Sequence, residues 1–310
     1  DGKMVKNEIK TFDSSGKNLI HHEIIDNSGR KIIQTVKIPK SVSKEEFTIV
    51  KCSNCDFHFT NPRPIDEELG KYYISDHYIS HNNTSETLFE KTYQFIRKIA
   101  IKGKFNLINS FIKNGRILDI GCGTGDFLNK CKSEGWETKG IEPSDIARKQ
   151  AIKNHSLSVE ENTDLTKLNG EFDIITMWHV LEHVTEVNQT VIELNRLLNT
   201  NGKAIIAVPN YKSYDSSFYK KYWAAYDLPI HLYHFSKESI SKLFENHGFS
   251  MVKTKGMKFD SYYVSMLSEE HRLGKKNIFR AFIIGSISNC LAFLTKRGYS
   301  STIYVFEKAK

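Results

Sequence analysis

From Arg116 to Asn210 the chain alternates short β-branched apolar segments with amphipathic ones, and this alternation limits its fold more than any other feature. Parallel strands joined by helices need right-handed crossovers, which cover both faces of a sheet. The sequence therefore predicts a doubly wound α/β domain with a mainly parallel sheet. Strands are expected at 116–120, 137–143, 171–178 and 203–210, and helices at 126–135, 144–154 and 187–202.

Composition and charge are those of a chain that can bury a full core, with 39% hydrophobic and 26% charged residues. The net charge of +8 favours anionic partners such as nucleic acid, an acidic membrane surface or phosphorylated substrates. Five cysteines, an odd number, favour thiols over a disulfide framework. No segment resembles a secretion signal or a bilayer-spanning stretch, so we expect a cytoplasmic protein.

The loop "GCGTG" follows the first predicted strand of this sheet. Asp119 lies near the end of that strand, while Gly121, Gly123 and Gly125 lead into a helix. Ligands of open α/β sheets bind beyond the carboxyl ends of the strands, and glycines let the backbone approach them closely. Glu142, at the end of the second strand, is the expected partner of ribose hydroxyls. Because Asp119 would face a pyrophosphate, the loop favours a cofactor with a cationic or zwitterionic tail.

Turn signals and prolines divide the chain into three parts. Residues 1–65 read as a β-rich leader that ends at "NPRP", since proline disfavours continuing a regular element. Residues 66–112 are expected to form a helical linker or cap. Residues 113–310 then form the α/β domain, with an aromatic-rich insertion, expected to be a lid, at about 211–235.

The leader contains a CxxC motif between two predicted strands, formed by Cys52 and Cys55. A tetrahedral zinc site needs two further ligands. His21 and His22 are the nearest substitutes in the sequence, and adjacent histidines seldom chelate together. We therefore favour a degenerate ribbon that folds without metal over a zinc site.

Five segments occur in the order found in class I S-adenosylmethionine-dependent methyltransferases: "LDIGCGTGDFL", "GIEPS", "FDIITMWHVLEHV", "LLNTNGKAIIAVPN" and "HLYHFSKESISKLFENHGF". The chain resembles that family from about residue 84 onward, and its leader resembles the ribbon-like leader of bacterial ubiquinone-methyltransferase-like members. The resemblance implies a seven-stranded Rossmann-like sheet and S-adenosylmethionine as cofactor, with Asp164 or Leu165 at the adenine. The implied cofactor-binding residues are Asp119, Gly121, Cys122, Gly123, Gly125, Glu142, Pro143, Asp164, Leu165, Trp178 and His179.

Three ionisable residues, His179, Glu182 and His183, follow the strand 171–178. In a doubly wound sheet this strand ends beside the reactive end of the cofactor. Their spacing of three and four residues would place them on one face of a helical turn. Imidazole and carboxylate groups can accept a proton from an acceptor or bind a divalent metal. A purely structural role also stays open.

The same segment resembles two metal-dependent O-methyltransferase groups, the ubiquinone-biosynthesis enzymes and the small-RNA 3′-end 2′-O-methyltransferases. Both carry an acid-x-x-Glu-His cluster and a further histidine after the next strand. In this chain Glu182 and His183 match, His179 replaces the first acid, and His231 is the candidate further histidine. The resemblance implies that these four residues line the acceptor side. A divalent metal on Glu182, His183 and His231 remains open.

Two later segments bear on partners. The insertion at 211–226 is rich in tyrosine. Aromatic faces suit sugars, quinone rings or bases, although ordinary packing explains at least half of these aromatic residues.

The segment from Lys275 to Arg297 has an apolar centre between basic ends. We expect a helix that packs on the sheet or on a second subunit, ahead of peripheral contact with an anionic membrane.

These features predict a methyltransferase that modifies an oxygen of a small-molecule acceptor. A sugar or lipid-linked glycan is favoured over a quinone-type phenol. An RNA 2′-O-methyltransferase is an alternative that fits the sequence pI of about 9.0, but the chain carries no separate nucleic-acid motif. A non-catalytic binding module is a second alternative, against which the intact Asp119, Glu142 and glycine positions argue. The sequence leaves the oligomeric state open.

Overall fold

The computed structural model describes residues 5–12, 18–25, 33–37, 47–52, 56–74, 88–295 and 297–310. Proximity of Cα atoms divides the chain into two compact units. The first, here the sheet unit, contains residues 83–208, 241–255 and 303–310. The second, here the composite unit, contains residues 1–82, 209–240 and 256–302. The predicted leader, the predicted lid insertion and the C-terminal apolar segment thus belong to one unit, although they are far apart in the sequence.

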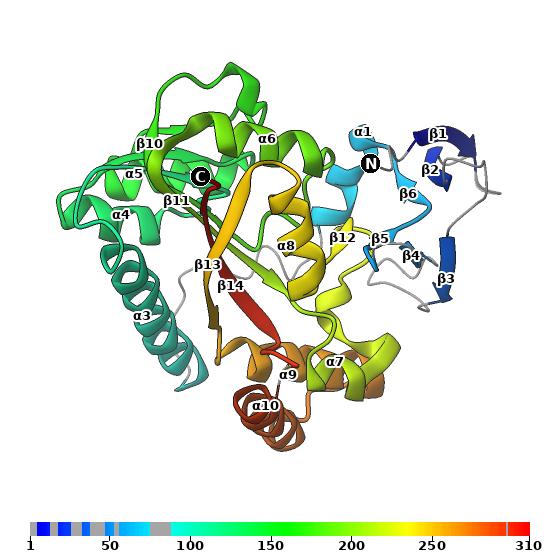
Figure 1. Cartoon of the computed structure of the whole chain (residues 1–310). Helices are drawn as coiled ribbons and strands as arrows, with labels where there is room; N and C mark the ends of the chain where they lie inside the picture. Colours follow the sequence, from blue (N-terminus) through cyan, green and yellow to red (C-terminus); the bar gives the residue numbers. More distant parts are fainter. Residues whose placement is uncertain are drawn as a thin grey trace. The chain divides into compact units, whose positions relative to one another are not determined.

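A seven-stranded sheet forms the centre of the sheet unit, and Figure 1 shows it with β13 and β14 at one edge. Strand β10 pairs in parallel with β7 and β11, and β8 pairs in parallel with β7 and β9. The predicted seven-stranded, mainly parallel sheet is therefore confirmed. In spatial order its strands are β13 (Phe249–Gly256), β14 (Ser301–Lys308), β11 (Leu198–Pro209), β10 (Phe172–Trp178), β7 (Arg116–Ile120), β8 (Glu137–Ile141) and β9 (Val159–Glu160).

The strand order reverses between β7 and β10. From β7 the chain continues to β8 and β9 on one side, and it then returns to place β10 and β11 on the other side. Such a reversal opens a crevice beyond the carboxyl ends of the two central strands, which is where ligands of this architecture bind. The register pairs Asp119 with Thr176, so the two side chains lie next to each other at this position.

Burial explains why these segments are strands. Four successive residues of β7, from Ile117 to Ile120, are buried, which requires cover on both faces of the sheet. The covering connections of the sheet unit include α4 (Asp126–Ser133), α5 (Asp145–His155) and α6 (Val187–Leu197), and α3 (Leu88–Asn109) packs against α4.

The expectation that the helix after β10 extends to Gly202 is wrong. Helix α6 ends at Leu197, and Leu198 already belongs to β11. Leu198 pairs with Phe172 of β10, and each of these two side chains is 1% exposed. Burial of this pair outweighs the helical pattern of the local sequence, because the apolar area removed from water exceeds the small differences in helix propensity.

The composite unit contains two small sheets, as the β-rich leader predicts. Their strands are β1 (Val5–Phe12), β2 (Asn18–Ile25) and β6 (Arg63–Pro64) in one, and β12 (Tyr233–His234), β5 (His58–Thr60), β4 (Thr48–Cys52) and β3 (Ile33–Lys37) in the other. Strand β12 comes from the predicted lid insertion and pairs antiparallel with β5 of the leader. This pairing is anchored by Thr60, whose backbone N–H donates to the Leu232 carbonyl at 2.9 Å.

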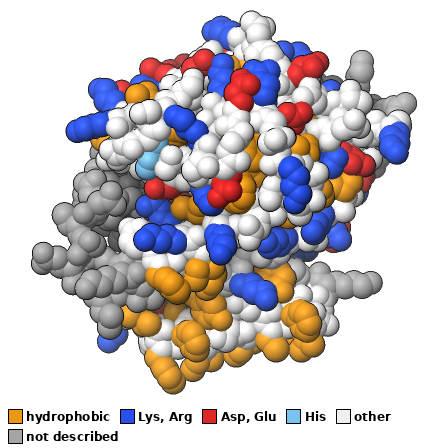
Figure 2. Space-filling view, turned by 90° about the vertical axis from the view of Figure 1, so that its left-hand side faces the viewer, with side chains coloured by type: hydrophobic (Ala, Val, Ile, Leu, Met, Phe, Trp, Pro, Cys, Tyr) orange, Lys and Arg blue, Asp and Glu red, His pale blue; other side chains and the backbone are white. Residues whose placement is uncertain are grey.

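The rest of the composite unit is largely helical. Its helices include α1 (Asp66–Leu69), η1 (Gly70–Ile74), α7 (Tyr214–Tyr219), η3 (Lys220–Tyr222), η4 (Ala224–Tyr226), α9 (Asp260–Leu273) and α10 (Ile278–Leu294). Tyr219 and Trp223 of the insertion are core residues, as ordinary packing predicts. Helix α10 packs against α9 and α7, while Figure 2 shows hydrophobic side chains gathered on the surface in this region. None of the described helices is long and apolar enough to cross a membrane.

A buried carboxylate joins three parts of the composite unit. Asp215 of α7 accepts hydrogen bonds from the Trp223 indole N–H at 2.8 Å, the Ser288 hydroxyl at 2.7 Å and the Ser300 hydroxyl at 2.6 Å. Asp215→Ala leaves three buried donors without their acceptor, so we expect the free energy of unfolding to fall by about 3 kcal/mol. Urea denaturation measures this change.

Asp145→Ala is the matched control. Asp145 is exposed and pairs with Arg148 at 3.0 Å and with Lys149 at 2.6 Å on the surface of α5. Exposed ion pairs contribute little, so its removal should change the free energy of unfolding much less than Asp215→Ala does. Equal losses in the two variants would contradict a structural role of the Asp215 network.

Candidate active site

The glycine loop follows β7 in a left-handed backbone conformation, with φ values of 71°, 55° and 80° at Gly121, Gly123 and Gly125. A Cβ atom at Gly121 would lie 2.4 Å from a methyl group of Val180, and one at Gly125 would lie 2.5 Å from a methyl group of Leu157. These two glycines are therefore required by packing. A Cβ at Gly123 would meet no heavy atom of the described chain within 4 Å. Gly123 thus leaves open space over the loop.

Glu142 is buried directly behind this open glycine. Its Oε2 accepts a hydrogen bond from the Gly123 N–H, and its Oε1 accepts one from the Ser144 N–H, both at 2.8 Å. A carboxylate oxygen has two lone pairs, so each oxygen can accept a second hydrogen bond. The structure therefore brings the predicted acid and the glycine loop together.

A second acid, Asp119, lies at the end of β7 and is 1% exposed. The Thr176 hydroxyl donates to its Oδ1 at 2.5 Å. Burial raises the pKa of the Asp119 carboxyl to about 7, the hydrogen bond from Thr176 and the charge of Lys104 oppose this rise, and the charge of Glu142 adds to it. A cation bound next to Asp119 would lower this pKa, because the cation stabilises the ionised form of the carboxyl.

Further predicted cofactor residues, namely Cys122, Pro143 and Asp164, follow the strands β7, β8 and β9 in the chain. Cys122 is buried, and its backbone N–H donates to the Ile141 carbonyl at 3.0 Å, while Pro143 is exposed. Asp164 caps the short helix η2 (Leu165–Lys167), and its Oδ1 accepts hydrogen bonds from the Thr166 N–H and hydroxyl. The carboxylate of Asp164 is therefore engaged within its own turn, and the adenine contact of Asp164 or Leu165 stays a prediction.

Trp178 ends β10 with an indole ring that packs edge-on against Phe127, with ring centroids 5.2 Å apart. The Lys104 ammonium of α3 lies 4.3 Å from the Trp178 ring centroid. Neither Lys104 nor Thr176 is among the residues predicted for this site from the sequence. Thr176 could have been identified from the sequence, because it is a hydroxyl residue inside a largely apolar strand. Lys104 could not have been identified from the sequence, because its position over the Trp178 ring depends on how α3 packs.

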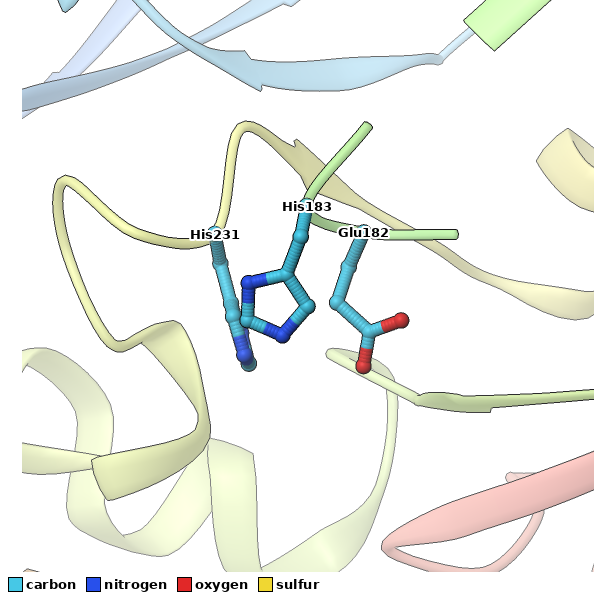
Figure 3. Close-up of side chains that lie close together, drawn as sticks. All are labelled: Glu182, His183 and His231. Atoms are coloured by element: carbon cyan, nitrogen blue, oxygen red, sulfur yellow. The ribbon is translucent and has the colours of Figure 1, made fainter. Parts of the chain in front are cut away.

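The ionisable cluster follows Trp178 in a tight turn. His179 has a left-handed φ of 59°, its N–H donates to the Ala207 carbonyl at 2.9 Å, and its Nδ1 lies 3.3 Å from Glu182 Oε1. The His183 N–H closes the turn on the Val180 carbonyl at 3.0 Å. Figure 3 shows the Glu182 and His183 side chains extending to the same side of this turn.

The expected helical turn through all three residues is therefore wrong in part. Only residues 181–183 form a turn, and His179 precedes it with a left-handed backbone. His179 reaches Glu182 through this bend and not through helical spacing. The Glu182 side chain is 1% exposed and that of His179 is 33% exposed, so the carboxylate lies behind an imidazole that solvent can reach.

His231 belongs to the composite unit, on the loop before β12. Its Nδ1 lies 2.9 Å from the Ala225 carbonyl, which fixes the proton on Nδ1 and leaves the lone pair on Nε2. Its own carbonyl accepts a hydrogen bond from the Thr60 hydroxyl at 2.6 Å. The neighbouring His234 is buried, which holds its pKa well below the usual value, and the charges of His231 and His58 act in the same direction.

A small hollow in the composite unit adjoins these histidines. It is lined by Pro209, Tyr211, Trp223, Ala225, His231, Tyr233, His234 and Phe235. The lid insertion therefore contributes aromatic faces beside His231, although Trp223 itself is almost fully buried in the core.

Of the two cysteines of the CxxC motif, the structure describes Cys52. Cys52 is 1% exposed within β4, and its N–H donates to the Phe57 carbonyl at 2.9 Å. Cys55 and the side chains of His21 and His22 lie outside the described residues. A zinc site at Cys52 and Cys55 and a degenerate ribbon without metal both stay predictions.

Comparison with known proteins points to one family. A family model described as a methyltransferase domain matches residues 90–254. The chain is 28% identical over 181 residues to a ubiquinone biosynthesis O-methyltransferase of Pelagibacter ubique, covering 54% of this chain and 75% of that protein. It is 30% identical over 122 residues to the protein of the same name from Rickettsia conorii, covering 36% of this chain and 41% of that protein. Less than half of the length of the Rickettsia protein is therefore matched.

Solved structures share the fold at low sequence identity. A magnesium protoporphyrin IX methyltransferase from Synechocystis with bound SAH superposes with a TM-score of 0.53 and 15% identity, covering 79% of this chain and all of that one (100%). A SAM-dependent methyltransferase from Archaeoglobus fulgidus gives a TM-score of 0.50 and 21% identity, covering 71% of this chain and 98% of that one. At these identities the likeness concerns the fold alone.

Proposed function

Because the chain belongs to the methyltransferase domain family and has the fold of class I S-adenosylmethionine-dependent methyltransferases, we propose that it transfers a methyl group from S-adenosylmethionine to an oxygen of a small-molecule acceptor. The observation that carries the cofactor assignment is the open space over Gly123, with Glu142 hydrogen-bonded to the N–H of the same residue. Glu142 would bind the ribose hydroxyls. Asp119 would stabilise the cationic end of the cofactor.

Residues of the turn after β10 would handle the proton of the acceptor. S-adenosylmethionine supplies an electrophilic methyl group on a sulfonium, and transfer to oxygen is an in-line displacement. As the new carbon–oxygen bond forms and the carbon–sulfur bond breaks, the acceptor hydroxyl loses its proton. His179 is the proposed proton acceptor at Nε2, because its Nδ1 faces Glu182. Glu182 holds the ring in this orientation and stabilises the imidazolium that forms.

A sugar or lipid-linked glycan is the favoured acceptor, and a quinone-type phenol is the second choice. Tyr211 and Tyr233 beside His231 are half-buried and support both, because an aromatic face packs against a sugar ring or a phenol. The similarity to ubiquinone biosynthesis O-methyltransferases supports an oxygen as the methylated atom. His183 and His231 are proposed to line the acceptor side.

A divalent metal is the second proposed role for this cluster. Glu182 and His183 provide a carboxylate and an imidazole from one turn, and both suit a divalent transition metal. His231 is the third ligand that the sequence resemblance implies, with its lone pair on Nε2. Metal analysis of protein purified without chelator, compared with His183→Ala, separates the two roles: stoichiometric metal that is lost in the variant would favour the metal.

An RNA acceptor is the remaining alternative, and the net charge of +8 is the observation in its favour. Binding of unstructured RNA with a steep dependence on salt would support it, because neutralised phosphates release counterions. Weak binding with little dependence on salt would leave the small-molecule acceptor as the proposal.

The pH dependence of cofactor binding tests the role of Asp119. Its pKa of about 7 means that the carboxyl is mostly protonated below this pH and mostly ionised above it. A sulfonium binds better to the ionised form, so we expect affinity for S-adenosylmethionine to rise about tenfold from one pH unit below to one unit above the pKa. Isothermal titration calorimetry across this range measures the rise.

Asp119→Asn separates this effect from titration of the ligand. The variant keeps the shape of the side chain but cannot ionise, so any pH dependence that remains belongs to the amino group of S-adenosylmethionine. Binding to Asp119→Asn should be weaker and should lose the tenfold rise. Identical pH profiles for the variant and the wild type would remove Asp119 from the proposed site.

A further inference from the structure

Helix α10 places its small residues inside and its large residues outside. Its buried positions are Ala281, Ile284, Gly285, Ser288 and Ala292. Four of these five side chains are among the smallest that occur. A helix that serves only to fill a core has the opposite arrangement, with large apolar residues on the buried face.

Close packing against α9 explains the small inner residues. A Cβ at Gly285 would lie 3.1 Å from the backbone N and Cα atoms of Tyr262, and the Ser261 hydroxyl donates to the Gly285 carbonyl at 3.2 Å. Ser288 donates to the buried Asp215. These contacts fix how α10 is rotated about its axis, so its outer face is determined by the same packing.

The outer face is apolar along the whole helix. Phe279 and Phe293, near the two ends, are 77% and 79% exposed. Figure 2 shows the resulting gathering of hydrophobic side chains at the lower end of the view, where Figure 1 places α10. Exposed patches of this kind mark interaction surfaces. The exposed apolar residues of α10 include Ile278, Phe279, Phe282, Ile283, Phe293 and Leu294.

Positive charge flanks this face at both ends. Residues 271–297 contain six lysines and arginines and no aspartate or glutamate. Two of these basic residues pair with acids that directly precede the segment: Lys276 with Glu270 at 3.8 Å and Arg280 with Glu269 at 3.2 Å. Lys275 and Lys276 precede the helix, Arg297 follows it, and all three are exposed. Long basic side chains next to an apolar helix face can reach anionic headgroups while the apolar face enters the acyl boundary.

We propose that the outer face of α10 binds the surface of an anionic lipid bilayer, with the helix lying in the plane of the interface. The distribution of charge selects this partner over a second copy of the chain. Pairing two copies of α10, parallel or antiparallel, would bring basic ends against basic ends, because the adjacent Glu269 and Glu270 are already paired with Arg280 and Lys276 of their own chain. Anionic headgroups instead complement both ends at once.

Vesicle flotation tests the proposal with the full chain. Wild-type protein should float with vesicles of phosphatidylcholine and phosphatidylglycerol and bind much less to phosphatidylcholine alone. The double variant Phe279→Ser, Phe293→Ser should lower the partition coefficient about a hundredfold, roughly tenfold for each phenylalanine. Lys275→Gln with Lys276→Gln should lower it about tenfold or more on anionic vesicles only.

Phe95→Ser is the matched control, because Phe95 is 64% exposed on α3 and belongs to the other unit. It should bind vesicles like the wild type. All of these side chains are exposed, so circular dichroism and the thermal midpoint should be unchanged. Absence of flotation by the wild type, or an equal loss in Phe95→Ser, would overturn the proposal. Dimers without lipid that become monomers in the Phe279→Ser, Phe293→Ser variant would assign the face to a second copy instead.

Discussion

Gly123→Arg is expected to weaken binding of S-adenosylmethionine at least about a thousandfold, which corresponds to roughly 4 kcal/mol. The position is open above the loop, so an added side chain enters the space proposed for the cofactor. The arginine also places a positive charge next to a cationic ligand, which adds repulsion to the loss of room. Isothermal titration calorimetry measures the affinity, and urea denaturation measures the stability of the same preparation.

Gly135→Arg is a close match for this substitution. Gly135 follows α4, has a φ of 90°, and a Cβ there would also meet no described heavy atom within 4 Å. Both variants therefore pay a similar backbone strain of about 1–2 kcal/mol for a non-glycine residue in the left-handed region. Only Gly123→Arg should lose the cofactor. Normal binding by Gly123→Arg would show that the cofactor is not bound over this loop.

His179→Asn is expected to lower the rate of methyl transfer about a thousandfold, within the range found for removing a general base. Asparagine tolerates the left-handed φ of 59° better than alanine does, so the variant removes the imidazole with little added strain. The affinity for S-adenosylmethionine should change less than about threefold, because proton transfer and not binding is affected. Transfer of labelled methyl to catechol and to methyl glucoside measures the rate for a phenol and for a sugar.

Two further variants show whether His179 acts with Glu182. Glu182→Gln keeps the side-chain shape but removes the charge behind the imidazole, so it should lower the rate about tenfold to a hundredfold and shift the pH profile. His247→Asn changes a histidine that lies 3.1 Å from Asn188 on the surface, and it should leave the rate unchanged. Full activity of His179→Asn together with loss of activity on chelation would assign the chemistry to a metal.

Much of the sheet unit could be predicted because its signals are local. The strands around the glycine loop are marked by runs of β-branched residues, and the loop itself by glycines, which the structure places at positive φ. Glu142 could be identified because the end of the next parallel strand must lie at the same edge of the sheet. The end of α6 could not, because the pairing of Leu198 with Phe172 competes with a local helical pattern.

The composite unit as a whole could not be predicted, because its segments are joined by contacts between residues far apart in the sequence. The pairing of Tyr233 with Phe59 joins the lid insertion to the leader across more than half of the chain. The sequence showed that α10 is apolar between basic ends, and it predicted a packed helix. It did not show that the small residues of α10 would lie on the buried face, because the rotation of the helix about its axis depends on the close packing of Gly285 against Tyr262.

The sequence by itself determined the order of the strands along the chain, the glycine loop after β7 and the acids at or after the ends of β7 and β8, because each of these is marked by residues close together in the sequence. Tertiary structure alone decided that Asp119 is buried against Thr176, that Lys104 lies over Trp178, and which face of α10 meets solvent. Burial and charge are properties of the three-dimensional neighbourhood. The pKa of Asp119 and the exposure of Phe279 therefore appear only once distant segments are packed together.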